Sequence, residues 1–596
     1  MKELAHLNKY FWKYKYYLSF GILFVIINNV AGVYPPRIIG YAFDLVKENI
    51  DYYRLLSGFS LQESFYSFFS YGLVMFGVIV LCLALIKGLF MFLMRQTIIV
   101  MSRLIEYDLK NEIYEHYQKL ATSFYKKNQT GDLMSRATED VSRARMYVGP
   151  AIMYSINLTV LIIMVVTAML SVNVRLTVLV LTPLPLLAIS IYYVNSIINK
   201  RSEIIQAQLS NLTSIAQESF SGIRVLKSYV QETPTNNYFS KESEDYKIKS
   251  LDLARINALF HPLMVALIGL STIITIYVGG MGVIAGSITA GNIAEFVIYV
   301  NMLTWPVASI GWVASIIQRA AASQKRINEF LNTEADIVNP TTAPLTLKGG
   351  VEFKNVSFTY PHTGIEALKK VSFSILPEQK IAIVGRTGSG KSTIASLLER
   401  LYDVSNGEIL IDGQDIREVN LLELRRQIGY VPQDVFMFSD SVANNIAFGN
   451  HQMDRSKIEH AAMMADVLDD INDLPQKFET TLGERGVNLS GGQKQRLSLA
   501  RALVKEPQII LLDDCLSAVD ATTEKTILNH LDTYLKDKTA IIITHRISSL
   551  LDFDQILVLE EGAVVEQGNH QELMKAQGVY YDLYTKQELG EQVGSK

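Results

Sequence analysis

Long apolar stretches dominate the first 320 residues, whereas later residues alternate short apolar runs with polar segments. A helix needs about 20 apolar residues to cross a bilayer. Stretches of at least this length lie at 17–43, 69–94, 148–170, 176–198, 257–284 and 292–317. Six of them in so short a length argue against the alternative of buried core helices in a soluble protein. We therefore expect a polytopic α-helical membrane domain over residues 17–325, with six transmembrane helices.

Basic residues gather in two of the segments between these stretches. Between the second and third stretches lie Arg95, Arg103, Lys110, Lys119, Lys126, Lys127, Arg136, Arg143 and Arg145. Between the fourth and fifth lie Lys200, Arg201, Arg224, Lys227, Lys241, Lys247, Lys249 and Arg255. The short loops 171–175 and 285–291 contain a single basic residue, Arg175. Because cytoplasmic loops carry the excess of Lys and Arg, both termini are expected in the cytoplasm, below the plasma (inner) membrane.

The first 16 residues mix Lys9, Lys13 and Lys15 with aromatic side chains. This combination is typical of a helix that lies in the membrane interface. The first apolar stretch that follows has no small-residue cleavage pattern, so we expect no cleaved signal peptide.

Helical periodicity continues from the apolar stretches into both basic segments. At 1.5 Å per residue, such helices extend tens of ångströms beyond the bilayer before they turn. The turns are expected at 124–141 and 219–232, where a glycine separates polar helical stretches. These turns would then be able to contact a soluble domain.

The run GRTGSGKST at 385–393 fits the P-loop pattern, with the strand-like IAIV before it and the helix-forming TIASLLERL after it. Its glycines allow backbone N–H groups to curl around phosphate oxygens at a helix N-terminus. Lys391 is expected to reach the β- and γ-phosphates, and the Ser392 hydroxyl to bind Mg²⁺. The candidate nucleotide-binding residues here are Gly385, Thr387, Gly388, Ser389, Gly390, Lys391, Ser392 and Thr393.

A second motif, LSGGQKQR, follows at 489–496. Its Ser-Gly-Gly turn opens a helical stretch, and a helix N-terminus offers N–H groups to an anion. The second half of the chain is therefore expected to form an α/β P-loop NTPase domain over 348–590, after a linker at 326–347 and before a tail at 591–596.

Composition excludes several other functions. The formal net charge of −4, from 55 basic and 59 acidic residues, gives no electrostatic case for nucleic acid binding. Cys82 and Cys515 are too few and too far apart for a disulfide framework or a metal site.

The order of these features resembles that of the ATP-binding cassette exporters, as a half-transporter with one membrane domain ahead of one nucleotide-binding domain. The resemblance implies that Ser490, Gly491 and Gly492 face a γ-phosphate held by a second subunit. It also implies ATP and Mg²⁺ as ligands, with Mg²⁺ held by Ser392, Gln433 and Asp513.

Further roles are implied residue by residue. Tyr360 in SFTYP resembles the aromatic residue that stacks on adenine, with a strand tyrosine in a local core as the alternative. Gln433 in YVPQD resembles the glutamine that links Mg²⁺ and the attacking water to the membrane domain. His545 in IIITHR resembles the switch histidine at the γ-phosphate, and Asp520 in LSAVD the loop that crosses to the opposite site. The segment TLGERG at 481–486 resembles the one that senses the cytoplasmic loops.

One position departs from the family pattern. At the last position of the run IILLDD, the family has a glutamate that acts as general base, whereas this chain has Asp514. Aspartate is one methylene shorter, so its carboxylate retreats by roughly 1.5 Å, and a misplacement on the order of 1 Å can cost about 10²-fold in rate. We therefore expect slow ATP turnover at this site.

In the family, this aspartate beside an intact signature is typical of the impaired subunit of heterodimeric exporters. We favour a heterodimer with a second half-transporter, and a homodimer stays open because aspartate can still orient water. A mainly ATP-binding, regulatory subunit is a further alternative. A soluble cassette ATPase would lack the apolar stretches, and importers usually keep the two domains on separate chains.

The transported molecule is the least defined feature. Charges inside a membrane are costly and suggest function, which draws attention to Lys87 and Glu295, although Lys87 can also snorkel or pair along the bundle. Aromatic and amide side chains could line a cavity for amphipathic molecules or simply pack: Asn28, Tyr34, Phe90, Tyr299, Asn301 and Trp305. A lipophilic drug or a lipid is the substrate class that the resemblance implies.

Overall fold

The structure is a computed structural model that describes residues 2–448, 454–545 and 553–594. The chain divides into two compact units. Unit 1 comprises Met1–Tyr117 with Gly131–Thr333, and unit 2 comprises Gln118–Thr130 with Glu334–Lys596.

Among the described residues, six helical runs are long and apolar enough to cross a membrane, each 41 to 59 residues long, and they make up most of unit 1. This confirms the six predicted spans. Four are single helices, α2 (Lys15–Leu55), α3 (Leu61–Lys119), α11 (Glu232–Ile284) and α12 (Ala290–Leu331). At 1.5 Å per residue the runs are roughly 60 to 90 Å long, two to three times the thickness of a hydrocarbon core of about 30 Å. The helices therefore continue beyond the membrane, as their periodicity predicts.

The other two spans are composite. One consists of α5 (Thr130–Ser135), α6 (Val141–Met146) and α7 (Ile152–Val172), joined through two π-helical turns at Arg136–Asp140 and Tyr147–Ala151. The other consists of α8 (Val174–Leu181) and α9 (Pro183–Ser221). A Cβ on Gly149, inside the second π turn, would lie 2.6 Å from Oγ of Ser102. Only glycine permits this close approach to α3.

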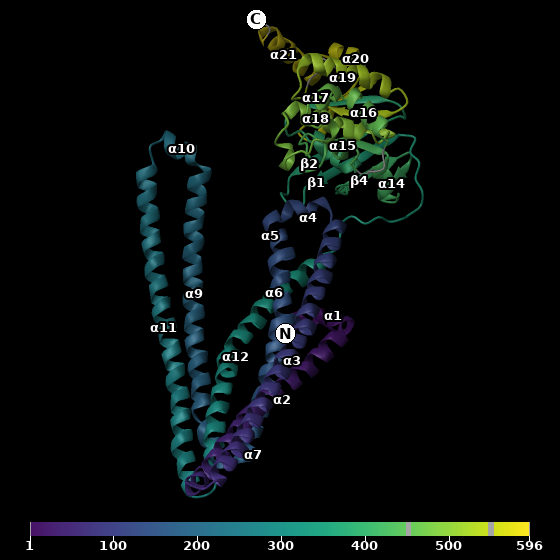
Figure 1. The fold of residues 1–596 in the computed structure, drawn as a ribbon. Coiled ribbons are helices and arrows are strands. Elements are labelled where there is room, and N and C mark those ends of the chain that lie inside the picture. Colours follow the sequence, from purple (N-terminus) through teal and green to yellow (C-terminus); the bar gives the residue numbers. More distant parts are fainter. Residues whose placement is uncertain (1, 449–453, 546–552, 595–596) are drawn as a thin grey trace. The chain divides into compact units, whose positions relative to one another are not determined.

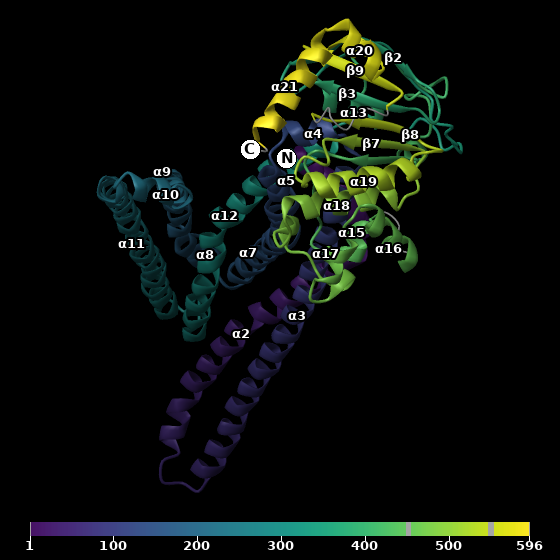
Figure 2. The same cartoon turned by 90° about the horizontal axis from the view of Figure 1, so that it is seen from above.

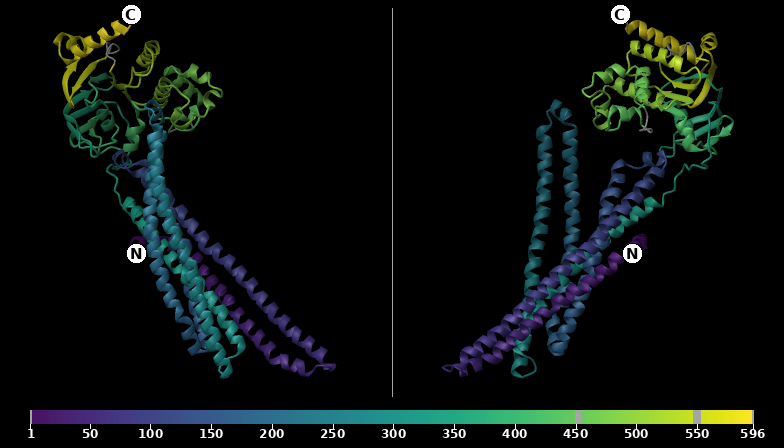
Figure 3. Two further views of the ribbon diagram at one scale, coloured as in Figure 1. Left: turned by 90° about the vertical axis from the view of Figure 1, so that its left-hand side faces the viewer. Right: turned by 45° about the vertical axis from the view of Figure 1, so that its right-hand side comes forward.

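Helices α9 and α11 lie side by side and are joined through α10 (Ile223–Ser228), as Figure 1 and Figure 3 show. Figure 2 shows α2 and α3 as a second long hairpin. Helix α12 packs against α2, α7 and α11. The shared apolar core includes Val33, Val165, Met169, Phe296 and Leu303. By contrast, the most apolar window of α3 is 0% buried within the chain, so this face requires lipid or protein around it.

The N-terminal segment consists of a 3-10 helix at Lys2–Leu7 and α1 (Asn8–Lys13). Asp108 on α3 accepts hydrogen bonds from Lys13 Nζ at 2.6 Å and from Tyr14 OH at 2.9 Å. Asn328 on α12 donates to the carbonyl oxygen of Glu3 over 2.8 Å. Asp108 lies 14 residues beyond the predicted end of its span, or roughly 20 Å along the helix. The segment expected at the interface is thus held against two helical extensions by polar contacts.

The two predicted turns are present, with one correction. The second occupies 219–232 as expected, because α9 ends at Ser221, α10 follows and α11 begins at Glu232. The first is shorter than 124–141, because helix resumes at Thr130 and continues to Val172. It holds α4 (Thr122–Lys127), which belongs to unit 2, and Ser123 Oγ there donates to Asp336 Oδ2 over 2.5 Å.

Unit 2 contains two sheets. The six-stranded sheet has the order β10-β9-β3-β8-β7-β6, parallel except for β10, and the antiparallel sheet has the order β2-β1-β4-β5. The strands are β1 (Val351–Thr359), β2 (Glu366–Ile375), β3 (Lys380–Gly385), β4 (Asn406–Ile411), β5 (Gln414–Asp415), β6 (Ile428–Val431), β7 (Ile509–Asp513), β8 (Thr539–Ile543), β9 (Gln555–Glu560) and β10 (Ala563–Gly568).

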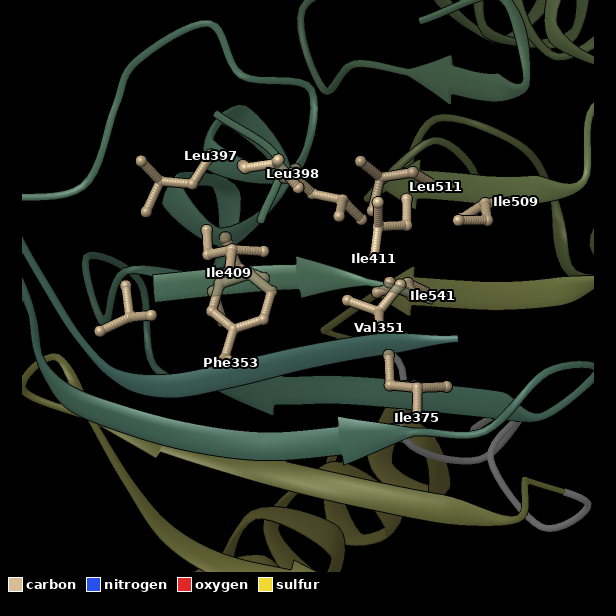
Figure 4. Close-up of a cluster of buried hydrophobic side chains, with 14 of the residues drawn as sticks. Val351, Phe353, Ile375, Leu397, Leu398, Ile409, Ile411, Ile509, Leu511 and Ile541 are labelled. Atoms are coloured by element: carbon tan, nitrogen blue, oxygen red, sulfur yellow. The ribbon is translucent and has the colours of Figure 1, made fainter. Parts of the chain in front are cut away.

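The core of unit 2 joins the two sheets around helix α13 (Lys391–Leu398). Figure 4 shows Val351 and Phe353 of the antiparallel sheet near Leu397 and Leu398 of α13. Leu511 and Ile541 of the parallel sheet belong to the same buried cluster. Near-continuous apolar runs on β3, β7 and β8 are typical of parallel strands covered on both faces. The predicted fold, a six-helix membrane domain and an α/β P-loop domain, is confirmed.

Candidate nucleotide-binding site

The P-loop leaves the carboxyl end of β3 and leads into α13. Gly385, Gly388 and Gly390 have φ values of 153°, 82° and 98°. A Cβ would lie 2.2 Å from the Leu559 carbonyl oxygen at Gly385 and 2.4 Å from that of Ala367 at Gly390. The backbone therefore requires glycine at both ends of the loop, and the helix N-terminus that follows suits an anion.

A cavity of about 550 Å³ lies over this loop. It brings together eleven of the predicted site residues, namely Tyr360, Thr387, Gly388, Gly390, Lys391, Ser392, Thr393, Gln433, Asp513, Asp514 and His545. Its other lining residues were not predicted: Ile365, Glu366, Ala367, Lys369, Ile543, Glu561 and Gly562. Gly385 lines an adjacent cavity, and Ser389 lines neither.

Lys391 is buried at the start of α13. Its Nζ donates to the carbonyl oxygens of Gly385 and Arg386, each at 2.9 Å. Burial lowers the pKa of this ammonium, and the carboxylates of Asp513 and Asp514 oppose that shift. The buried Ser389 Oγ has no hydrogen-bond partner among the described residues. A phosphate group would offer acceptors to both side chains, so the loop fits a nucleotide.

Asp513 ends β7 with only 2% of its surface exposed. Burial raises the pKa of this carboxyl group, and a hydrogen bond from the Ser392 side chain works in the opposite direction. With the Gln433 amide on the same cavity, the site presents the hard oxygen donors that Mg²⁺ prefers. The donor set therefore fits this ion.

Asp514 has a φ of 48°, and its N–H donates to the Ile543 carbonyl oxygen over 2.8 Å. Nε2 of Gln433 donates to Asp514 Oδ2 over 3.4 Å. His545 follows β8 and lines the same cavity. Burial, followed by the nearby Lys391 ammonium, lowers the pKa of His545, so its ring is neutral at pH 7. The carboxylate, the amide and the imidazole that the sequence singles out thus line the same cavity.

The Tyr360 hydroxyl and Thr393 Oγ1 form a hydrogen bond of 3.0 Å. The Tyr360 ring also makes edge contacts with Phe358 and Tyr402, at centroid distances of 4.9 and 5.5 Å. It therefore both packs in a local core and lines the cavity, which reconciles the two interpretations of this residue. The return strand β2 supplies three of the unpredicted lining residues, Glu366, Ala367 and Lys369, because the chain turns back after Tyr360, whose N–H pairs with the Ile365 carbonyl oxygen over 3.0 Å.

The signature lies outside this cavity. Ser490 caps α18 (Gly491–Leu503) with a reciprocal capping box to Gln493. Asp520 similarly caps α19 (Ala521–Tyr534) by accepting from the N–H groups of Thr522 and Thr523. Neither Ser490, Gly491, Gly492 nor Asp520 lines the cavity. The chain thus presents a P-loop surface and a separate helix N-terminus.

Comparison with known proteins decides the family. Residues 18–307 match the family described as ABC transporter transmembrane region, and residues 368–517 match the family described as ABC transporter. A probable multidrug resistance ABC transporter ATP-binding/permease protein, YheI of Bacillus subtilis, is 36% identical over 98% of both chains. The chain belongs to the ABC transporter family.

Other relatives of this ABC transporter carry related names. The multidrug resistance-like ATP-binding protein MdlA of Escherichia coli is 35% identical over 99% of this chain and 97% of its own. An ATP-dependent lipid A-core flippase of Syntrophus aciditrophicus is 36% identical over 82% of each chain. A bacterial Atm1-family ABC exporter with ATP bound superposes with a TM-score of 0.74, at 26% identity over 96% of this chain and 99% of that one.

These matches confirm the predicted resemblance to an exporter half-transporter. The ABC transporter is a multi-pass integral membrane protein whose ATPase activity is coupled to transport.

The membrane residues singled out in the sequence differ in their burial and in their contacts. Tyr299 and Asn28 are buried, and the Tyr299 hydroxyl donates to the Val33 carbonyl oxygen over 3.0 Å. The Phe90 ring packs against the Phe24 ring at a centroid distance of 5.7 Å. The Asn301 side chain donates a hydrogen bond to the backbone of its own helix. Tyr34 and Trp305 remain exposed within the chain, at 52% and 61%. Lys87 lies beside Gly32 on α2, and Glu295 is buried on α12.

Proposed function

We propose that this ABC transporter uses ATP to export amphipathic or lipophilic molecules, drugs or lipids, across the plasma (inner) membrane with both termini in the cytoplasm. The observation that carries the proposal is the separation of the P-loop cavity from the signature at Ser490. A chain whose own cavity lacks the signature requires a second subunit to supply it. Relatives described as multidrug resistance transporters and lipid A-core flippases support the substrate class.

In the proposed cycle, each ATP is bound between one P-loop and the signature of the opposite subunit. Lys391 and the backbone N–H groups of the loop bind the phosphates, while Tyr360 stacks on the base. Ser392, Asp513 and Gln433 would hold Mg²⁺, which neutralises the charge that develops on the phosphates during transfer. Asp514 orients the attacking water and His545 contacts the terminal phosphate. The turns that hold α4 and α10 pass the closure of the nucleotide-binding domains to the membrane helices.

The position of Asp514 favours a heterodimer. Its carboxylate is shorter than that of glutamate by roughly 1.5 Å, so the site of this chain would hold ATP with little turnover. Its intact signature would complete a competent site on the other half-transporter. The homodimer is the alternative, since Gln433 and His545 are both present beside Asp514.

Disulfide crosslinking tests the assembly. We would introduce Ser490→Cys and Thr387→Cys together into a Cys82→Ser, Cys515→Ala background of the full chain. A homodimer predicts a crosslinked dimer of this chain that increases with ATP and Mg²⁺. A heterodimer predicts no self-crosslink, but a crosslink to the equivalent P-loop position of a co-expressed second half-transporter. Absence of both crosslinks would refute the shared-site proposal.

ATPase and transport assays test the function itself. Efflux of a fluorescent lipophilic cation or flip of a labelled lipid from proteoliposomes should depend on ATP and stop in the Lys391→Ala variant. If the chain without a partner hydrolyses ATP at a rate of many turnovers per second, the heterodimer is refuted. If the heterodimer binds ATP but neither substrate moves, a regulatory role for this chain is favoured.

A further inference from the structure

Gln495 lies on the signature helix α18, and only 7% of its surface is exposed. Both ends of its side-chain amide are hydrogen-bonded. Its Oε1 accepts from the Ala518 N–H over 3.0 Å, and its Nε2 donates to Ser517 Oγ over 3.2 Å. One buried side chain therefore ties α18 to the loop that follows β7.

The same loop carries the carboxylate of this chain's own site. Ser517 Oγ donates to the main-chain carbonyl oxygen of Asp514 over 3.0 Å. A hydrogen-bonded path thus runs from Gln495 through Ser517 to the backbone of Asp514. Because Asp514 adopts φ 48°, its side-chain direction depends on the turn that this path supports.

Close packing reinforces the connection at the signature itself. A Cβ on Gly492 would lie 2.9 Å from the carbonyl oxygen of Ala518, so this glycine allows the signature turn to lie directly on the loop. The loop and the signature are therefore in contact at both Gly492 and Gln495.

The other face of α18 is bound elsewhere. Gln493 Nε2 donates to Asp470 Oδ1 and Arg496 Nη1 pairs with Asp470 Oδ2, each at 2.8 Å. Asp470 lies on α17 (Leu468–Asn472). Residues two apart on a helix point in nearly opposite directions, so Gln493 and Gln495 hold α18 between α17 and the loop after β7. Among the side-chain hydrogen bonds and ion pairs of Gln493, Gln495 and Arg496 to the described residues, only those of Gln495 reach the loop.

We propose that Gln495 is a positioning residue that keeps the loop 514–520 at a constant spacing from the signature. Its function is to make one chain's own ATP site and the signature that it lends to the other subunit move together. This inference rests on the proposed function, because it takes the signature to complete a second subunit's site. Glutamine suits this role because its amide both accepts from an N–H and donates to a hydroxyl.

The test compares three variants in the full-length transporter, purified in the assembly that it forms. Gln495→Leu removes both hydrogen bonds, and Ser517→Ala removes the hydroxyl that links Gln495 to Asp514. Leu499→Ala is the control for a loss of packing without a loss of hydrogen bonds, because this side chain is one turn along α18, is fully buried in the apolar cluster that includes Cys515, and forms no hydrogen bond. Each variant is examined for ATP affinity, kcat, KM and thermal stability.

Gln495→Leu is expected to lower kcat by about 10-fold or more, since small displacements of catalytic groups have effects of this order. The affinity for a fluorescent ATP analogue should stay within about two-fold, because the P-loop is untouched. The double variant with Ser517→Ala should be no slower than the slower single variant, since both changes break one path. Leu499→Ala should lower the unfolding temperature while kcat stays within about three-fold below that temperature.

Unchanged kcat in Gln495→Leu would overturn the inference, as would a loss of kcat that the Leu499→Ala control reproduces at matched stability. The Ser490→Cys crosslink is measured in parallel on the Gln495→Leu background. Absence of the crosslink from both this background and the parent would refute the proposed dimer instead. A crosslink retained in both, together with the selective loss of kcat, supports the positioning role.

Discussion

Nε2 of Gln433 lies 3.4 Å from Oδ2 of Asp514, although 81 residues separate them in the chain. The relationship follows from the sheet, because Gln433 comes soon after β6 and Asp514 comes directly after β7, which are adjacent and parallel. Side chains at the carboxyl ends of neighbouring parallel strands meet in one crevice. The position of the Asp514 carboxylate in this crevice can therefore be tested directly.

Asp514→Glu should increase the rate of ATP hydrolysis at this chain's own site by about 10- to 100-fold, because it extends the carboxylate by roughly 1.5 Å towards the cavity. A small loss of thermal stability should accompany the gain, since aspartate tolerates a φ of 48° better than glutamate does. Steady-state ATPase assays and thermal unfolding measure both effects. Asp514→Asn is the control and should remove the remaining turnover at this site. If Asp514→Glu is no faster than the parent, carboxylate length is not the defect.

Because Tyr360 and Thr393 share one hydrogen bond, we expect removal of the bond from either side to have the same effect on ATP affinity. Tyr360→Phe and Thr393→Val each remove this bond and keep the ring that faces the cavity. Each should weaken ATP binding by about two- to tenfold, from a loss of about 0.5–1.5 kcal/mol. Tyr360→Ala should cost more, because stacking on a base contributes about 1–3 kcal/mol. Titration with a fluorescent ATP analogue measures all three, and equal affinities for Tyr360→Phe and Tyr360→Ala would exclude a stacking role.

Cys515 should be almost unreactive in the folded protein. Burial raises the pKa of its thiol to about 12, so about one molecule in a thousand is a thiolate at pH 9. Iodoacetamide labelling of a Cys82→Ser variant at pH 9 should therefore be very slow until the protein unfolds. Because the unfolded thiol has a pKa of about 8.5, the folded state holds more protons above that pH. Cys515 thus lowers stability as the pH rises from about 8.5 to 12, and fast labelling of the folded protein would contradict this.

The burial of Asp140 predicts that replacing its partner Arg326 destabilises the protein more than replacing Asp140 itself. Its side chain is 1% exposed, accepts from Ser323 Oγ over 2.7 Å, and pairs with Arg326 Nη1 at 3.2 Å. Arg326→Met leaves this carboxylate buried without its cation and should cost about 3 kcal/mol, whereas Asp140→Asn should cost less. The double variant should be more stable than Arg326→Met alone. Thermal unfolding in nanodiscs measures all three, and additive losses in the double variant would argue against a coupled pair.

The motifs of the nucleotide-binding half predicted eleven of the residues that line the cavity over the P-loop. Gly385, Gly390 and Lys391 obey local rules, because a phosphate-binding turn needs positive φ values and a helix N-terminus at fixed spacing. The six membrane spans followed from length and polarity alone. Asp513, Asp514 and His545 come together because they lie at or just beyond the carboxyl ends of β7 and β8 in one parallel sheet, which the apolar runs before them indicate.

The features that the sequence could not disclose all depend on long-range partners. Ile365 and Lys369 line the cavity only because β2 pairs with β1 and returns to the P-loop. The attachment of the N-terminal segment depends on Asp108 and Asn328, which are distant in the chain and have no pattern of their own.

The two π-helical turns at Arg136–Asp140 and Tyr147–Ala151 change what the third span presents to its neighbours. Each wide turn accommodates one additional residue, and one residue rotates a helix by about 100°. Together they rotate the end at Thr130 by roughly 200° relative to a straight helix, so Asp140 and Gly149 can each meet their own partners. Deleting one residue from either π-helical turn would rotate one part of the helix by about 100° relative to the rest. Asp140 or Gly149 would then be turned away from its partner.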